Sequence, residues 1–326
     1  MFSRPFNRQP MALDLLDTPL RISWDLHQND QPMPAPLVEL VLQRLADAGV
    51  FFVTLQRQPL LHPQIGQILH HLAGSGCQAL VVCQGTPAEL AALDVALPLP
   101  NLLLDIAPWT AGGKLLPTPL TAAVAQVRSQ GFEPGLLLVP NSENICLIPE
   151  VFELCRELGI GRFKLPNTPH DGSLTHASAL PGPADLERLA AVLRGQPLKA
   201  SSAVSLEIHD LFLWELLVPA LGGERGEYGG CQAANSIGHI DGEGRLHPCS
   251  SWPQVLGSLA GQSIEDLWAS SLRQQIRAEI AACPRGCRGC GDYPLCFGGC
   301  RGLARSLNAS AGGRDLLCRG PRPPRR

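Results

Sequence analysis

The chain has 326 residues, 45% of them hydrophobic and 17% charged, which suits a soluble globular protein with room for two domains. Its 26 Lys and Arg against 29 Asp and Glu give a net charge of −3, which excludes a global charge that drives binding to nucleic acid or to a membrane. No signal-peptide segment is apparent, and the longest apolar run, DLFLWELLVPAL, is too short to span a bilayer. We therefore expect a cytoplasmic protein whose thiols stay reduced.

Between residues 20 and 200, apolar runs rich in β-formers alternate with amphipathic helical runs. The expected strands are residues 20–26, 50–55, 78–83, 101–106, 135–140 and 161–165. The expected helices lie near 35–48, 63–74, 87–96, 119–130, 148–158 and 183–194. This alternation predicts an α/β fold with a parallel sheet and right-handed crossovers, either an open (β/α)6 barrel or a doubly wound sheet. Neither glycine-rich nucleotide motif is present, so a nucleotide cofactor has no support.

The composition predicts five segments along the chain. They are an N-terminal extension (1–19), the barrel (20–200), a connector that becomes glycine-rich (201–230), a small Cys-rich domain (231–318) and a basic tail (319–326). The Cys-rich domain opens with SIGHIDGEGRLHPC, which predicts a β-hairpin turning at Asp241-Gly242 and folding Cys249 back toward Cys231. Ser263 and Asp266 then resemble a capping box at the start of a helix.

Eight of the twelve cysteines lie from Cys231 onward, and four of them read C-x2-C-x5-C-x3-C from Cys287 to Cys300. Thiols two and three residues apart usually share a metal or a metal cluster rather than form disulfides. A structural zinc site commonly has two C-x2-C knuckles and this chain has one, so iron–sulfur clusters are favoured and zinc is the alternative. Residues 283–326 carry nine Arg and two acids, which suits an anionic cluster; the alternative is a solvated tail.

The cysteine pattern, together with Gly244, resembles the SPASM domain, the auxiliary-cluster module of many radical SAM enzymes. The resemblance implies two iron–sulfur clusters, expected to be [4Fe-4S]. By position, the first would be held by Cys287, Cys290, Cys296 and Cys318. The second would be held by Cys231, Cys249 and Cys300, one ligand short. Cys283, His239, Asp241 or His247 could complete it, with Cys283 or His239 preferred; the alternative is an open iron.

The N-terminal half resembles a radical SAM barrel that has lost its chemistry. PLRISWDLH resembles the first strand of that fold, but only Gln28 to Ala35 follow before the next helix, without the C-x3-C-x2-C motif. Where a GGEP-like motif is expected, the chain has Gln56-Arg57-Gln58-Pro59, so Gln58 replaces the carboxylate and Arg57 would repel an ammonium. We therefore expect neither SAM binding nor SAM cleavage. The four cysteines of this half are expected to be small core residues: Cys77, Cys83, Cys146 and Cys155.

EIHDLFLWE at 207–215, EYGGCQAANSIGHIDGEG at 227–244 and CFGGCRGLAR at 296–305 are similar to the SPASM domain protein of the GeoRSP system. That resemblance implies a peptide substrate, a radical SAM/SPASM companion enzyme and a PqqD-like peptide chaperone. A noncatalytic partner protein is favoured, because no acid/base pair or activated nucleophile is visible. The alternative is an oxidoreductase or other enzyme that works at an auxiliary cluster with an open iron.

Polar residues at expected strand ends suggest that the barrel mouth binds a peptide segment. These residues are Arg57, Asp105, Asn141, Ser142 and Asn144. The alternative is ordinary loop capping by Asn and Ser.

Overall fold

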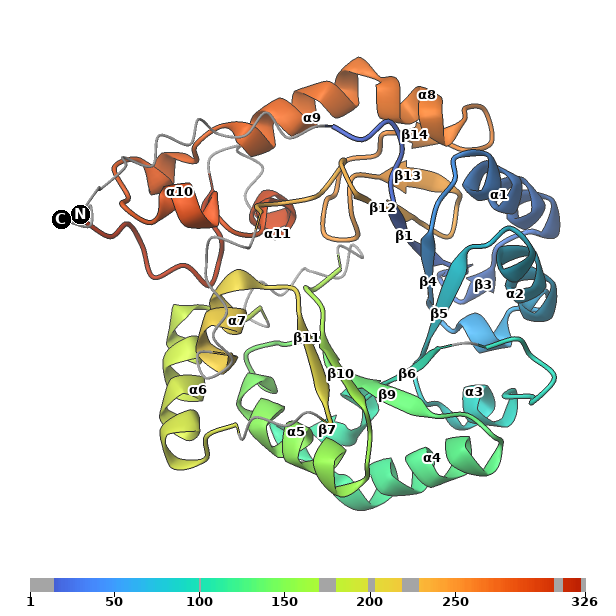
Figure 1. The fold of residues 1–326 in the computed structure, drawn as a ribbon, viewed down its shortest axis with the longest axis horizontal. Helices are drawn as coiled ribbons and strands as arrows, with labels where there is room; N and C mark the ends of the chain where they lie inside the picture. The colour runs from blue at the N-terminus through green and yellow to red at the C-terminus, as the bar shows by residue number, and fades with distance from the viewer. Residues whose placement is uncertain are drawn as a thin grey trace, which may run out of the picture.

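The computed structural model describes residues 15–99, 101–169, 180–198, 203–218, 229–307 and 313–323. In these residues, parallel strands form one curved sheet with helices along its outer side (Figure 1). The parallel strands, in spatial order, are β11 (Ser205–Ile208), β10 (Arg162–Leu165), β9 (Pro134–Leu137), β6 (Leu102–Asp105), β5 (Gln78–Cys83), β4 (Phe52–Gln56), β1 (Arg21–Asp25) and β12 (Ile237–Ile240). The covering helices are α1 (Ala35–Asp47), α2 (Ile65–Gly74), α3 (Pro87–Ala91), α4 (Pro117–Ser129), α5 (Ile148–Glu157) and α6 (Pro183–Gly195).

The α/β barrel expected from the sequence is therefore confirmed, because all six expected strands and their helices are present. Both faces of the central strands are buried: Val81 faces the main core between the sheet and the helices, whereas Leu80 and Val82 on the same strand join a second apolar cluster with Leu103 and Leu137. Alternate residues of a strand point to opposite faces, which explains why these strands are apolar throughout. Cys77, Cys83 and Cys155 are buried in the main core, as expected.

Residues 201–230 were expected to form a connector, but the structure places a strand and a helix in this segment. It contains β11, which extends the sheet beside β10, and helix α7 (Leu211–Leu217). The apolar pattern did not reveal β11 because this edge strand is only partly buried, and its Glu207 forms an ion pair with Arg162 of β10. The barrel therefore extends at least to Leu217 in the described residues.

The Cys-rich domain is joined directly to the barrel, because its first strand, β12, pairs in parallel with β1. The predicted hairpin forms between β12 and β13 (Arg245–His247), followed by β14 (Gly257–Ser258). Ser263 caps α8 (Ile264–Ala269) with the predicted capping box. Helix α9 (Ser271–Ala281), the 3-10 helix η7 (Arg285–Cys287), α10 (Tyr293–Cys296) and α11 (Arg301–Leu307) complete the domain.

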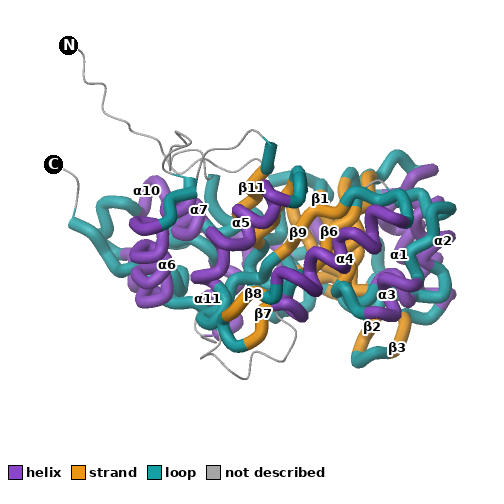
Figure 2. Tube along the Cα trace, turned by 90° about the horizontal axis from the view of Figure 1, so that it is seen from below, coloured by secondary structure: helices purple, strands orange, loops and turns teal. Residues whose placement is uncertain are grey.

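The thiol-bearing helices lie at one end of the molecule. Figure 2 shows α10 and α11 at the same end as α6 and α7 of the barrel. Residues 319–323 of the predicted tail are anchored there, since the Gly291 N–H donates to the carbonyl of Arg322 and Arg322 pairs with Asp292. Residues 1–14 and 324–326 lie outside the described residues.

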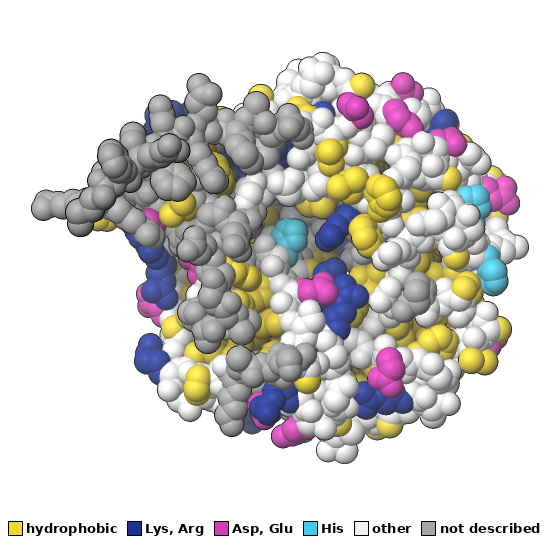
Figure 3. Space-filling view, viewed as in Figure 1, with side chains coloured by type: hydrophobic (Ala, Val, Ile, Leu, Met, Phe, Trp, Pro, Cys, Tyr) yellow, Lys and Arg dark blue, Asp and Glu magenta, His cyan; other side chains and the backbone are white. Residues whose placement is uncertain are grey.

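The amino-terminal end of the barrel carries a cluster of charges. In Figure 1 the strands run clockwise from β1 to β11, which for right-handed crossovers is the view from their amino-terminal ends. Figure 3 shows Lys, Arg and acidic side chains gathered in the hollow centre of this face. Lys164 lies on β10. Burial lowers the pKa of its ammonium group, and the charge of Glu207 on the neighbouring strand β11 raises it. Among the described residues, no helix is long and apolar enough to cross a membrane.

Candidate functional site

The first predicted thiol set surrounds a cavity of about 240 Å³ between α6, α7 and the C-terminal segment. Cys290, Cys296 and Cys318 line this cavity. Burial raises the pKa of the Cys287 thiol to about 12, and the charges of Cys296, Cys318, Cys283 and Cys290 raise it further. The structure therefore brings together the four cysteines predicted for the first cluster.

The backbone near this cavity suits a thiolate-bound cluster. Arg322 donates its N–H to Sγ of Cys290 at 3.3 Å, and such hydrogen bonds to sulfur tune iron–sulfur clusters. Between Cys296 and Cys300 the chain turns through three consecutive left-handed residues, with φ of 50° at Phe297, 85° at Gly298 and 69° at Gly299. Glycine adopts this conformation without the Cβ clash, so the sequence GG permits the tight return from one thiol set to the other.

The second thiol set, Cys231, Cys249 and Cys300, is also gathered. Burial and the neighbouring Cys231 raise the pKa of Cys249 to about 12. Burial also raises the pKa of Cys300, followed by the charges of Cys231, Asp315 and Cys249. Leu303 donates its N–H to Sγ of Cys300 at 3.5 Å, at the start of α11. A Cβ at Gly302 would lie 3.1 Å from Sγ of Cys249, so a glycine lets this thiol lie against the same helix.

The candidates for a fourth ligand of the second set lie with other groups. The charge of Cys283 raises the pKa of Cys287 and of Tyr293, which places Cys283 beside the first set. His239 lies in the barrel mouth, where Nδ1 is 2.9 Å from Oγ of Ser23 and Nε2 is 3.7 Å from Oδ2 of Asp25. His247 and Asp241 bind each other there at 3.0 Å. The second set therefore gathers three thiols, the number that its sequence pattern predicts.

The ligands of both sets are thiols, which bind iron–sulfur clusters and zinc ions. Within the described residues, no three His, Cys, Asp or Glu side chains converge closely enough to hold a single metal ion. A cluster spreads its thiolates over several iron atoms, whereas one zinc ion draws four sulfurs to about 2.3 Å. Each thiol set offers soft ligands with a backbone N–H on one sulfur, and such a donor set suits an iron–sulfur cluster.

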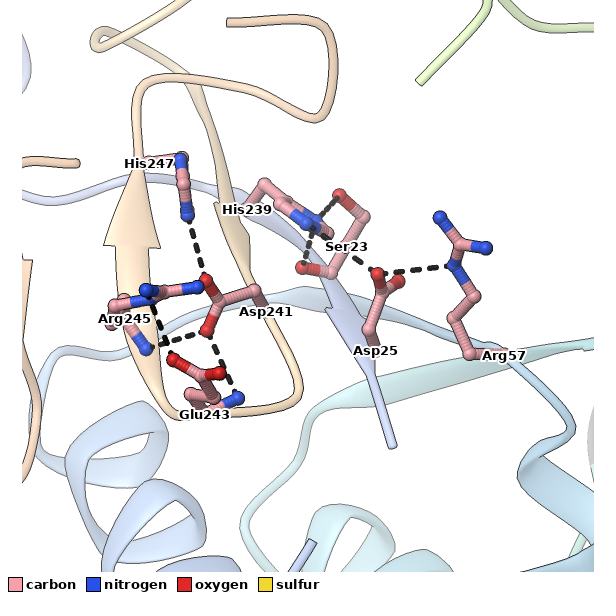
Figure 4. Close-up of polar contacts among 8 residues, drawn as sticks. All are labelled: Ser23, Asp25, Arg57, His239, Asp241, Glu243, Arg245 and His247. Carbon is pink, nitrogen blue, oxygen red and sulfur yellow. Dashed lines mark hydrogen bonds and ion pairs between the residues drawn. The ribbon is translucent and has the colours of Figure 1, made fainter. Parts of the chain in front are cut away.

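A second candidate site is a polar cavity of about 400 Å³ at the carboxyl-terminal ends of β1, β4, β5 and β12. Figure 4 shows its charged groups: Asp25 accepts from Nε of Arg57 at 3.3 Å, and Asp241 accepts from His247 and Arg245. These hydrogen bonds hold the pKa of Asp241 well below its usual range, although burial acts against them. Burial lowers the pKa of His239, and the charge of Asp25 acts against this.

A tight hairpin follows β1, at the place where the sequence lacks the C-x3-C-x2-C motif. Strands β2 (His27–Gln28) and β3 (Gln31–Pro32) are joined by Asn29 and Asp30, both with positive φ, as in a type I′ turn. Nδ1 of His27 binds the carbonyl of Arg57 at 2.8 Å. A Cβ at Gly242 would lie 2.6 Å from the carbonyl O of His27, so this hairpin packs against the turn of the SPASM-like hairpin.

The backbone around this cavity is strained. Arg57 and Gln58, at the position of the expected GGEP-like motif, have φ of 60° and 51°. A left-handed conformation costs a non-glycine residue roughly 1–2 kcal/mol, and such strain clusters at functional sites. Of the six described non-glycine residues with positive φ, four line this cavity: Asn29, Asp30, Arg57 and Gln58.

Of the predicted barrel-mouth residues, only Arg57 lines the cavity. Asn141 and Asn144 instead accept each other's backbone N–H groups, and Asp105 accepts the N–H of Ala107. Ser142 accepts from Arg188 through its carbonyl. The alternative of loop capping therefore describes Asn141 and Asn144. Asp25 and His27 were not predicted as site residues, although Asp25 lies near the end of the expected first strand and His27 directly follows it.

Glu89 provides a test of the packing beside this cavity. Its side chain is fully buried, and Oε2 accepts the N–H of Gln84 at 2.7 Å. Burial raises its pKa from 4.5 to about 7. Between these values the unfolded chain releases the proton first, so stability should fall as pH rises from about 4.5 to 7, by up to about 3 kcal/mol.

Glu89→Gln should remove this fall and make the protein more stable than the wild type at pH 8. Urea denaturation at pH 5 and pH 8 measures the difference. Glu133→Gln is the control, because Glu133 is exposed and pairs with Arg128 at the surface. Equal pH dependence in the wild type and Glu89→Gln would show that Glu89 is not the group responsible.

Comparison with known proteins agrees with this geometry. Residues 231–291 match the model of the SPASM iron–sulfur cluster-binding domain. The chain is 24% identical over 330 residues to PqqA peptide cyclase of Gluconobacter oxydans (strain 621H), covering 96% of this chain and 88% of that protein.

Two solved structures show the same fold. Streptococcus suis SuiB bound to precursor peptide SuiA has a TM-score of 0.65 and 18% identity, covering 94% of this chain and 77% of SuiB. Native anSMEcpe with bound AdoMet and a peptide has a TM-score of 0.62 and 14% identity, covering 92% of this chain and 94% of that one. The chain is thus similar to radical SAM/SPASM proteins in fold, and it carries their SPASM iron–sulfur domain at its C-terminal end.

Proposed function

We propose that this chain is a noncatalytic iron–sulfur partner protein of a radical SAM peptide-modification system in the cytoplasm. It works beside a radical SAM/SPASM companion enzyme and a PqqD-like peptide chaperone. The barrel binds the peptide or the companion, and the SPASM domain stabilises the fold or relays electrons. Cys287, Cys290, Cys296 and Cys318 hold one [4Fe-4S] cluster, and Cys231, Cys249 and Cys300 hold the second. Such clusters, when bound, accept and donate single electrons.

The single observation that carries the proposal is the hairpin β2–β3. It joins β1 to α1 through a two-residue turn, where a SAM-binding cluster needs a loop with three thiolates. No cysteine is among the described residues that line the cavity beside it. Gln58 supplies no carboxylate at this mouth, and Arg57 adds a positive charge to it. Both thiol sets of the SPASM domain are gathered, which supports a chain that keeps the accessory clusters without a SAM-binding cluster.

The peptide setting is supported by what the relatives are called and by the cavity. One relative is a cyclase of the peptide PqqA, and SuiB was solved with its precursor peptide SuiA. The cavity offers carboxylates, guanidinium groups and imidazoles within about 400 Å³. A polar mouth of this kind can bind the backbone and polar side chains of a peptide segment.

The test is an affinity experiment with the three named components. The cluster-loaded chain, immobilised under anaerobic conditions, should retain the radical SAM companion or its peptide, and the isolated chain with SAM and reductant should release no deoxyadenosine. Asp25→Asn with Arg57→Gln should weaken peptide retention, whereas Glu133→Gln should not. Deoxyadenosine formation by the chain alone would refute the proposal.

A second function is favoured by one observation. The second set gathers three thiols, while Cys283 and His239 lie with other groups, so an iron of that cluster would be open to a substrate. The chain would then be an oxidoreductase, or another enzyme, acting at this cluster. Substrate turnover by the isolated loaded chain, lost in Cys300→Ala, would favour this function over the partner role.

A further inference from the structure

Two arginines of α9 are buried against the loop that carries Cys231. Arg277 is only 4% exposed, and its Nη1 donates to the carbonyl oxygens of Cys231 at 2.8 Å and Ala233 at 2.9 Å. Arg273, one turn earlier, is 5% exposed and donates through Nε to the carbonyl of Ala234 at 2.7 Å. The helix therefore clamps the backbone on the C-terminal side of Cys231.

Arg277 lacks the partner that a buried cation normally has. In the part of the chain that the structure describes, no carboxylate forms an ion pair with it, and its Nε is buried without a hydrogen-bond acceptor. An unpaired buried charge is costly, so buried arginines are normally paired with an anion. Two carbonyl dipoles compensate a full positive charge only in part.

The residue whose carbonyl Arg277 holds at 2.8 Å, Cys231, also carries a thiol of the second set. A thiol carries a negative charge when it binds a metal cluster, because coordination removes its proton. The cluster proposed for Cys231, Cys249 and Cys300 would therefore supply the missing anion.

We propose that Arg277 is a positioning residue that fixes the Cys231 loop and provides the counter-charge of the second cluster, and so raises its reduction potential. Reduction adds a negative charge to the cluster, and a nearby buried cation favours that added charge. This inference rests on the proposed second cluster. Arg277 is expected to change the reduction potential of the second cluster and not that of the cluster at Cys290.

Redox titration of the anaerobically loaded chain, followed by EPR, tests the role. In Arg277→Gln the second cluster should become at least tenfold harder to reduce, a fall of about 59 mV for one electron. The first cluster should keep its potential and serves as an internal reference. Arg273→Gln is the matched control: it is equally buried and also binds a carbonyl, but it is one turn farther from Cys231, so a smaller fall is expected.

An unchanged potential in Arg277→Gln with full iron content would overturn the inference, as would equal falls in both clusters. If Arg277→Gln does not load the second cluster, Arg277→Lys decides. Loading in the lysine variant would support the counter-charge, and failure in both would overturn it. A wild-type chain that binds no iron would refute the proposed function itself, which is a distinguishable result.

Discussion

Cys290→Ala should remove the first cluster and leave the second, whereas Cys249→Ala should do the reverse. Each variant should keep about half of the wild-type iron, because the two thiol sets surround different positions and only one set loses a ligand in each case. EPR spectra of the reduced variants should each lose one component of the wild-type spectrum. Iron and sulfide analysis of anaerobically prepared protein gives the content.

The matched control is Cys146→Ser, which alters a half-buried thiol that packs against the main core and belongs to neither set. It should keep all of the iron. Loss of all iron in both Cys290→Ala and Cys249→Ala would contradict two separate clusters and would indicate one site that the two sets share.

Gly299→Ala should destabilise the loaded protein by about 3 kcal/mol, one of the largest effects of a single added methyl group. The left-handed φ of 69° costs alanine roughly 1 kcal/mol. The new Cβ would also overlap the carboxyl group of Asp315. That group is fixed, because it accepts the N–H groups of Cys300 and Leu317. Urea denaturation of the loaded protein measures the change in unfolding free energy.

Gly289→Ala separates backbone strain from this overlap. Gly289 has a similar φ of 74°, but no atom lies within 4 Å of the added Cβ. Its substitution should cost only about 1 kcal/mol. If both variants lost the same stability, the close packing of Asp315 against the Gly299 turn would not stabilise the domain as described.

The sequence predicted the barrel well because its signal is local. Apolar strands such as 78–83 alternate with helices whose apolar faces are read directly from the spacing, and the thiol pattern fixes which cysteines gather. The short strand β11 was not predicted because it is only partly buried and alternates polar with apolar residues, and its pairing with β10 joins residues far apart in the sequence.

The barrel mouth could be predicted only in part. The sequence alone shows that the cysteine loop is missing and that the GGEP-like motif is altered. The cavity, however, is built by contacts between residues far apart in the chain. His239 meets Asp25 only because β12 pairs with β1 over more than two hundred residues. Asn141 and Asn144 have the composition of a site but bind each other's backbone, which only the structure shows.

The most direct test of the central claim is the iron and acid-labile sulfide content of the anaerobically reconstituted chain, with zinc measured beside them. Two SPASM clusters without a SAM cluster predict about eight iron and about eight sulfide per chain, and no zinc. About twelve of each would reveal a third cluster and contradict the loss of the SAM site. Zinc without sulfide would contradict the iron–sulfur assignment of both thiol sets.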